Sequence, residues 1–152
     1  MIVEFLEVTG IDNHGRRLDQ VVAENDEYWE YTHNFIQWLF PLDEESRSVR
    51  GSPVLVEKHM LAIRESESAR INLQRSVTRY KGFLASTTNW RSGYDHKHLR
   101  ISGVIKCLRL LVNNEGANTF KYWAEDFWRS TSIHSVKICS PVVLHRFAVR
   151  VK

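Results

Sequence analysis

Apolar residues recur at three- and four-residue spacing along most of this chain, which is the pattern of amphipathic helices. The strongest example follows Asn25, a good N-cap residue, with Asp26 and Glu27 where carboxylates stabilise a helix N-terminus. Because Pro41 cannot continue a helix, we predict one long helix that ends at Phe40. Its apolar face covers more than half of the circumference, which is typical of a helix contacted on several sides.

The end of this predicted helix is its most apolar part. Trp38, Leu39 and Phe40 stand directly before the proline that turns the chain. We therefore expect all three side chains to be largely buried, and the sequence motif that contains them to be mainly structural.

Further helical patterns precede and follow this segment, separated by turn-rich stretches. They cover residues 18–24, 56–64, 68–84, 98–114 and 120–128, and Ser140 with Pro141 is typical of the start of a last helix over residues 140–149. Residues 2–18 are predicted to be irregular, 42–54 and 86–97 to be loops, and only 133–138 has a strand-like pattern. The sequence thus predicts an all-α fold of about six or seven helices in a single compact domain over residues 1–152.

The composition is that of an ordinary folded domain, with 43% hydrophobic and 26% charged residues among 152. Its two cysteines, Cys107 and Cys139, cannot form a disulfide framework, which favours a reducing compartment. Residues 1–10 lack the basic start of a secretory signal, and no apolar run reaches the roughly 18 to 20 residues that span a bilayer. We therefore expect a cytoplasmic protein, or a nuclear one in a eukaryote, with no membrane insertion.

Charge is distributed unevenly between the two halves of the chain. Residues 1–90 contain 10 Lys and Arg and 14 Asp and Glu, a net charge of −4, whereas residues 91–152 contain 11 and 4, a net charge of +7. A basic half can attract nucleic acid or an acidic partner. Alternatively the two halves attract one another within one fold, which we favour because no basic run exceeds Arg16-Arg17.

Residue patterns typical of catalysis or metal binding are not found in the sequence. The closest histidine pair is His96 and His98, whereas a zinc site needs three or four ligands, so hydrogen bonds near a helix start are the simpler role. The sequence also lacks a nucleophile elbow and a glycine-rich phosphate loop. We therefore expect a non-enzymatic protein without a metal or other cofactor.

Four segments carry recognisable motifs in a fixed order. Residues 10–19 read G-I-D-N-H-G-R-R-L-D, 32–42 read T-H-N-F-I-Q-W-L-F-P-L, 76–80 read S-V-T-R-Y, and 96–108 read H-K-H-L-R-I-S-G-V-I-K-C-L. Together they resemble the conserved region of the opioid growth factor receptor family, with Gly103 replacing an arginine of the family pattern. The resemblance implies a common fold and, from the family name, receptor-like binding of a peptide.

The second and fourth motifs supply five candidate partner-binding residues, namely His33, Gln37, Trp38, His96 and Arg100. In one arrangement they line a cleft between two helices that accepts a peptide carboxylate or backbone. In the other, the polar groups hydrogen-bond each other or nearby carbonyls and join the helices. We favour this second role for Arg100, because a buried arginine must be paired.

Two functions remain open at this stage. The favoured one is a helical module that binds a peptide or protein, and the alternative is a nucleic-acid-associated regulatory protein that acts through the basic half. The side chains available for that alternative are Lys97, Arg100, Lys106 and Arg109, with Trp90 and Tyr94 for base stacking. Since no nucleic-acid-binding motif accompanies them, we expect only weak, salt-sensitive association with duplex DNA.

Overall fold

The computed structural model describes residues 1–87 and 96–132. These residues form eight helices and no strand, apart from an isolated bridge between Leu42 and Val54. The helices are α1 (Ile2–Leu6), α2 (Leu18–Ala23), α3 (Asp26–Tyr31), α4 (Ile36–Leu39), α5 (Glu57–Glu65), α6 (Glu67–Ser86), α7 (His96–Leu111) and α8 (Asn114–Ser132). The predicted all-α class is confirmed.

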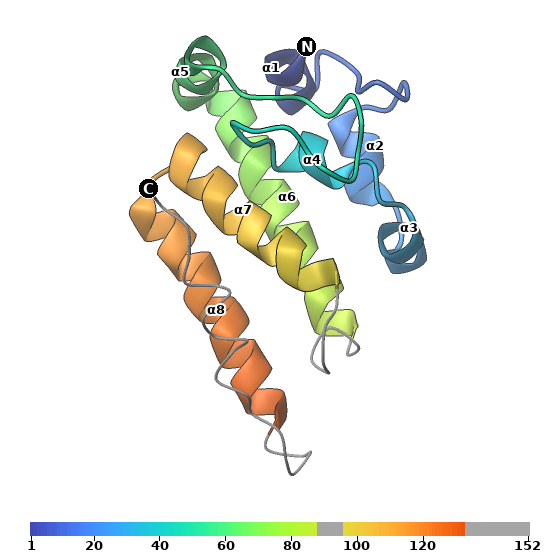
Figure 1. Cartoon of the computed structure of the whole chain (residues 1–152), viewed down its shortest axis with the longest axis vertical. Coiled ribbons are helices and arrows are strands. Elements are labelled where there is room, and N and C mark those ends of the chain that lie inside the picture. Colours follow the sequence, from blue (N-terminus) through green and yellow to red (C-terminus); the bar gives the residue numbers. More distant parts are fainter. Residues whose placement is uncertain (88–95, 133–152) are drawn as a thin grey trace.

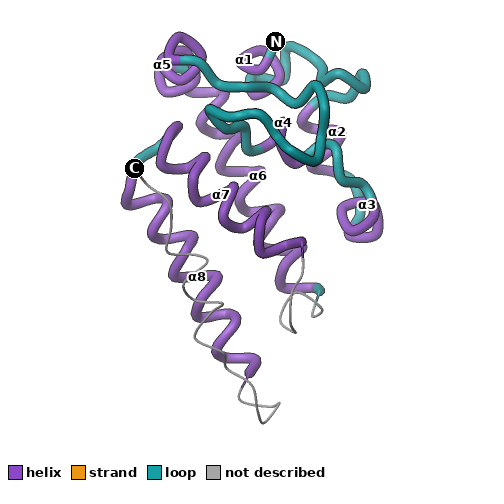
Figure 2. The backbone as a smooth tube through the Cα atoms, in the orientation of Figure 1, coloured by secondary structure: helices purple, strands orange, loops and turns teal. Residues whose placement is uncertain are grey.

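The three longest helices, α6, α7 and α8, run side by side, and the short helices gather around one part of α6 (Figure 1). Helix α6 contacts α1, α2, α3 and α5, while α7 packs mainly against α8. A long loop between α4 and α5 crosses over α4 (Figure 2). Helix α6 therefore occupies the centre of the described part of the chain.

The predicted single helix from Asn25 to Phe40 is wrong, because the chain forms α3 and α4 with an extended break between them. Phe35 shows the reason. Its ring lies 5.7 Å from that of Tyr28 and 4.9 Å from that of Trp29. In a continuous helix, residues six or seven positions apart are separated by about 9 to 10.5 Å along the axis, so this close packing favours a turn of the chain between them.

The chain begins with a helix, α1, although residues 2–18 were expected to be irregular. Ile2, Phe5 and Leu6 of α1 are buried, and α1 contacts α4, α5 and α6. A helix of five residues is too short to be stable alone, so these tertiary contacts hold it. Together with the division of the long helix, α1 raises the number of helices above the six or seven predicted.

The remaining elements follow the sequence prediction closely. Asn25 caps α3 by accepting a hydrogen bond from the Tyr28 amide at 2.8 Å, and Ser66 caps α6 through the Ala69 amide at 3.2 Å. Helix α8 begins earlier than its apolar pattern indicates, because Asn113 accepts the Gly116 amide at 2.7 Å. The expected strand at 133–138, the expected helix at 140–149, and Trp90, Tyr94 and Cys139 lie outside the described residues.

The core is aromatic, and Tyr80 of α6 lies at its centre. Its ring is 5.8 Å from that of Phe40, and 6.2 Å from each of the rings of Trp29, Phe83 and Phe120. Trp38 and Leu39 are fully buried and Phe40 is 3% exposed, so the predicted burial of these three residues is confirmed. Cys107 is also buried, and burial raises the pKa of its thiol far above the usual range.

Candidate functional site

Two residues of the predicted binding cleft meet where α3 gives way to α4. Arg100 of α7 donates from Nη2 to Nδ1 of His33 at 2.6 Å, and from Nη1 to the carbonyl oxygen of Trp29 at 3.4 Å. Burial, followed by the positive charge of Arg100, lowers the pKa of His33, while Glu30 acts in the opposite direction. The pairing expected for Arg100 is thus confirmed, and it joins α7 to the break after α3.

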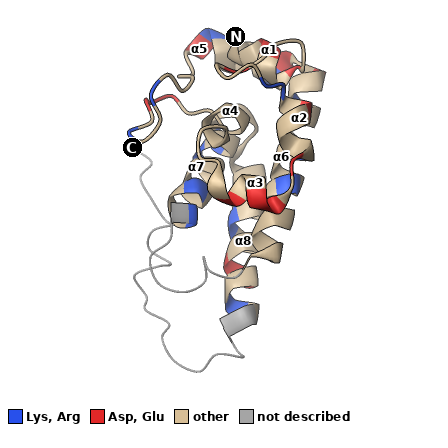
Figure 3. Cartoon of the chain, turned by 90° about the vertical axis from the view of Figure 1, so that its right-hand side faces the viewer, with Lys and Arg blue, Asp and Glu red and all other residues tan. Residues whose placement is uncertain are grey.

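A buried ion pair lies next to this contact. Lys97 Nζ is 2.6 Å from Glu30 Oε2 and 5.2 Å from the centre of the Phe83 ring, and the Lys97 side chain has no exposed surface. We call these four residues, Glu30, His33, Lys97 and Arg100, the α3–α7 seam. In Figure 3 the acidic residues of α3 lie between basic residues of α6 and α7.

This ion pair corrects one assignment made from the sequence. Lys97, considered there as a phosphate contact, is buried inside the fold. Lys106 is also paired, at 2.7 Å from Asp43 and 3.0 Å from Glu44 in the loop after α4. Two basic side chains of the second half therefore pair with acidic side chains of the first, which agrees with attraction between the halves.

The other three predicted site residues have separate environments. Trp38 is fully buried and packs edge-on against Phe5 of α1, with ring centres 5.4 Å apart. Gln37 is partly buried, and within the described residues neither its Oε1 nor Nε1 of Trp38 has a hydrogen-bond partner. His96 begins α7, but its side chain is outside the described part. The structure thus brings His33 and Arg100 together and directs Trp38 into the core.

Sequence reasoning assigned no role to Arg16, which organises a second polar cluster at the break. Its guanidinium donates to Asp12 at 2.7 Å, to the Tyr28 hydroxyl at 2.8 Å and to Asn34 Oδ1 at 2.9 Å. We call Asp12, Arg16, Tyr28 and Asn34 the Arg16 cluster. The signal in the sequence was the Asp12–Arg16 spacing of four residues around the turn at Gly15, which has φ +77°.

Asp12 is the acidic member of this cluster, and its side chain is fully buried. Burial alone would raise its pKa, but hydrogen bonds from the Arg16 side chain and from the Arg16 and His14 amides lower it. His33 and Asn34 are adjacent in the second motif. Each of them therefore accepts a hydrogen bond from an arginine in a distant part of the sequence. These contacts add to the packing of Phe35 in holding the chain in its extended break between α3 and α4.

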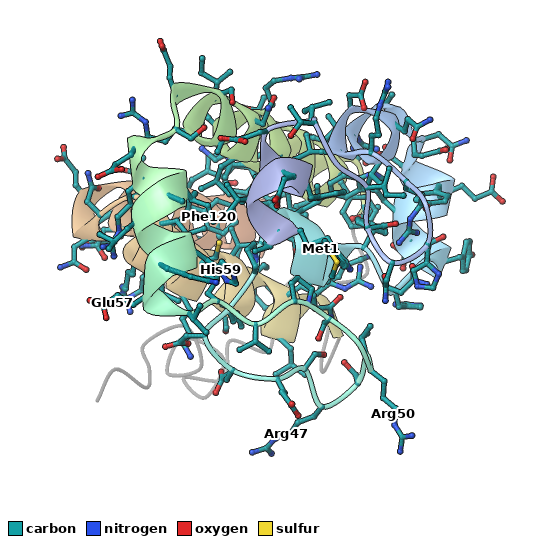
Figure 4. All side chains as sticks on the ribbon, turned by 90° about the horizontal axis from the view of Figure 1, so that it is seen from above. Met1, Arg47, Arg50, Glu57, His59 and Phe120 are labelled. Carbon is teal, nitrogen blue, oxygen red and sulfur yellow. The ribbon has the colours of Figure 1, made fainter. Side chains whose placement is uncertain are left out.

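An open groove lies elsewhere, between α6 and α8 at the end of α7. Its volume is about 310 Å³, and Val77, Leu108 and Phe120 form its floor. Lys81 stands at its edge, with Nζ 5.3 Å from the centre of the Trp123 ring. Figure 4, a view from above, shows Phe120 in the interior, whereas Arg47 and Arg50 point outward from the loop after α4.

One exposed apolar side chain lines this groove, and two others lie one helical turn from residues that line it. Val112 lines it and is 45% exposed. Ile71, one turn before the lining residue Gln74, is 54% exposed, and Tyr122, one turn after the lining residue Thr119, is 58% exposed. Sequence analysis missed this site, because Val112 continues the apolar pattern of the predicted helix over residues 98–114 although α7 ends at Leu111.

Metal binding finds no support in the described residues, where no group of three or more His, Cys, Asp or Glu side chains could hold an ion. Over residues 1–87 and 96–132, none of the helices combines the length and hydropathy of a membrane-spanning segment.

Comparison of the chain with family models, curated proteins and solved structures gave no match. The resemblance to the opioid growth factor receptor family therefore stays a prediction from motifs.

Proposed function

We propose that this protein is a non-enzymatic helical module that binds a peptide or a segment of another protein, with the groove between α6 and α8 as its contact surface. The observation that carries the proposal is the open groove with an apolar floor, with exposed Val112 in its lining and exposed Ile71 and Tyr122 one helical turn from residues that line it. Apolar residues clustered on an otherwise polar surface are typical of protein interaction sites.

The α3–α7 seam is less suited to binding a partner. Its basic groups are already occupied, since Lys97 pairs with Glu30 and Arg100 donates to His33. A partner would have to replace these internal contacts, and each replacement costs free energy. We therefore assign the seam to the fold and the groove to the partner.

A nucleic-acid function receives less support for the same reason. Lys97 and Lys106 would contribute phosphate contacts only after leaving their carboxylate partners. The family resemblance, with its implied peptide binding, agrees with the favoured function by analogy, as does the cytoplasmic or nuclear location expected from the sequence. The proposal contains no catalytic step and no cofactor.

Selection of random displayed peptides on the purified full chain tests this function. We expect selected peptides to bind saturably and to keep most of their affinity between about 50 and 200 mM salt, because apolar contacts are not screened. Duplex DNA measured in parallel should bind weakly and lose affinity steeply over the same range. Sequence-selective DNA binding that survives the higher salt, with no peptide selected, would overturn the proposal.

A further inference from the structure

We propose that the groove takes one amphipathic helix of a partner protein, oriented by charge, with an acidic residue at Lys81 and a basic residue at Glu115. This inference rests on the proposed function and names the chemistry of its partner.

The first argument is the position of Lys81. Its ammonium group lies over the Trp123 ring in a half-buried setting, and within the described residues it has no carboxylate at ion-pair distance. Lys97 and Lys106, by contrast, each form an ion pair with a carboxylate. A cation at the edge of an apolar groove is complementary to an acidic group of a partner.

The second argument is the opposite charge at the other end. Glu115 is exposed, lines the groove, and lies in the first turn of α8. Trp123 lies eight positions after it in α8, which corresponds to about 12 Å at 1.5 Å per residue. A partner with opposite charges two helical turns apart therefore matches both ends of the groove.

The third argument concerns the form of the partner. The groove walls are helices, whose backbone donors and acceptors are satisfied internally, so they offer few groups to an extended peptide backbone. A helical partner satisfies its own backbone and presents side chains only. Its apolar side chain would meet Val77 and Phe120 on the floor, with Val112 beside it.

Gly116 lines the groove and has no side chain, so it leaves space at that wall. A Cβ added there would lie 3.4 Å from Val112 and from Asn113, so it would fit but would narrow the space next to the exposed Val112. Substitution of Gly116 by a larger residue should therefore obstruct the groove from its wall, without altering either charged end.

Two synthetic helical peptides of about 14 residues provide the probes. Both carry the same leucine stripe; one has Glu and Lys seven residues apart on that face, and the other has Lys at both positions. Binding is measured by fluorescence anisotropy at low salt to the full chain and to Lys81→Glu, Lys81→Gln and Lys58→Glu. Lys58 is exposed on α5 and is outside the groove lining, so Lys58→Glu is the control of equal charge change.

The parent chain and Lys58→Glu should prefer the Glu/Lys peptide by about tenfold. Lys81→Gln should lose most of this preference, and Lys81→Glu should reverse it. Unfolding curves of each variant establish that it is folded, and the neutral Lys81→Gln variant serves if Lys81→Glu is not. Amide chemical-shift changes should concentrate on residues of α6 and α8 that line the groove.

An equal preference in all four proteins, or shift changes away from the groove, would overturn the inference. Failure of both probes with every variant would also overturn it. The proposed function survives these results if peptides from the random selection still bind the chain. It fails only when that selection also yields no binder.

Discussion

The α3–α7 seam and the groove between α6 and α8 are opposite kinds of surface. In the seam, Lys97 and Arg100 bind groups of α3 and the break after it, and Lys97 has no exposed surface. In the groove, the Lys81 ammonium lies over the Trp123 ring without a carboxylate partner among the described residues, and the apolar side chain of Val112 stays exposed. The residues that are easiest to recognise in the sequence therefore serve the interior, and inconspicuous ones form the open surface.

Removing a core residue should have the largest effect. Trp38→Ala leaves a cavity beside Phe5 in a fully buried position, and we expect a loss of about 3 to 5 kcal/mol in the free energy of unfolding. Urea denaturation followed by circular dichroism measures it. An unchanged midpoint for Trp38→Ala would show that this motif is not part of the stabilising core.

The Arg16 cluster should come next, and its neighbour supplies a matched control. Arg16→Ala leaves the buried Asp12 carboxylate without its guanidinium partner, and we expect a loss of about 2 kcal/mol. Arg17 pairs with Asp19 on the surface, so Arg17→Ala should cost less than about 1 kcal/mol. Equal losses for the two variants in denaturant unfolding would remove any special role for the cluster.

A pH titration of stability tests the seam. Because burial and Arg100 lower the pKa of His33 in the folded chain, the unfolded chain takes up this proton more readily. The contribution of His33 to stability is therefore fully present above its unfolded pKa of 6.5 and is lost as pH falls through the lower folded value. Denaturant unfolding at several pH values between 5 and 8 should show this decline.

The variant His33→Gln should remove this part of the pH dependence while the acid-induced loss from carboxylates persists at lower pH. Arg100→Ala should weaken it, since the charge that opposes protonation of His33 is gone. It should also lower the melting temperature by removing two hydrogen bonds. If Arg100→Ala left stability unchanged but abolished peptide binding, the seam and not the groove would be the contact surface.

The smallest effect on stability is expected at the groove. Tyr122 is 58% exposed, so Tyr122→Ser should change the free energy of unfolding by less than about 0.5 kcal/mol. The same substitution should weaken the binding of selected peptides, because it removes exposed apolar surface beside the groove. A stable variant with undiminished peptide binding would place the contact elsewhere.

Local signals in the sequence predicted most helices, because their information lies within a few residues. The Asn25 cap and the apolar stripe around Leu73, Val77 and Tyr80 are examples. The division of the long helix could not be predicted in this way. It depends on Arg16 and Arg100, which come from distant parts of the chain and hold Asn34 and His33.

The candidate sites show the same limit. The pairing of Arg100 was predictable, since a partly buried guanidinium needs acceptors, but its acceptors could not be chosen from spacing alone. The partner of Lys97 was not predictable either, because Glu30 and Lys97 lie in segments that meet only after folding. The groove depends on which helix faces stay uncovered, and this is a property of the assembled fold.

The span of the seam has a consequence for the order of folding. Arg100 and His33 are 67 residues apart, and Glu30 is joined to Lys97 across the same interval. During synthesis, the first half of the chain therefore emerges with an excess of negative charge, and α3, although it packs against α6, lacks its contacts to Lys97 and Arg100 until α7 leaves the ribosome. Contacts of such long sequence separation form late because loop closure costs entropy before they can form. The arrival of α7 should accordingly be the step that completes the fold around α3.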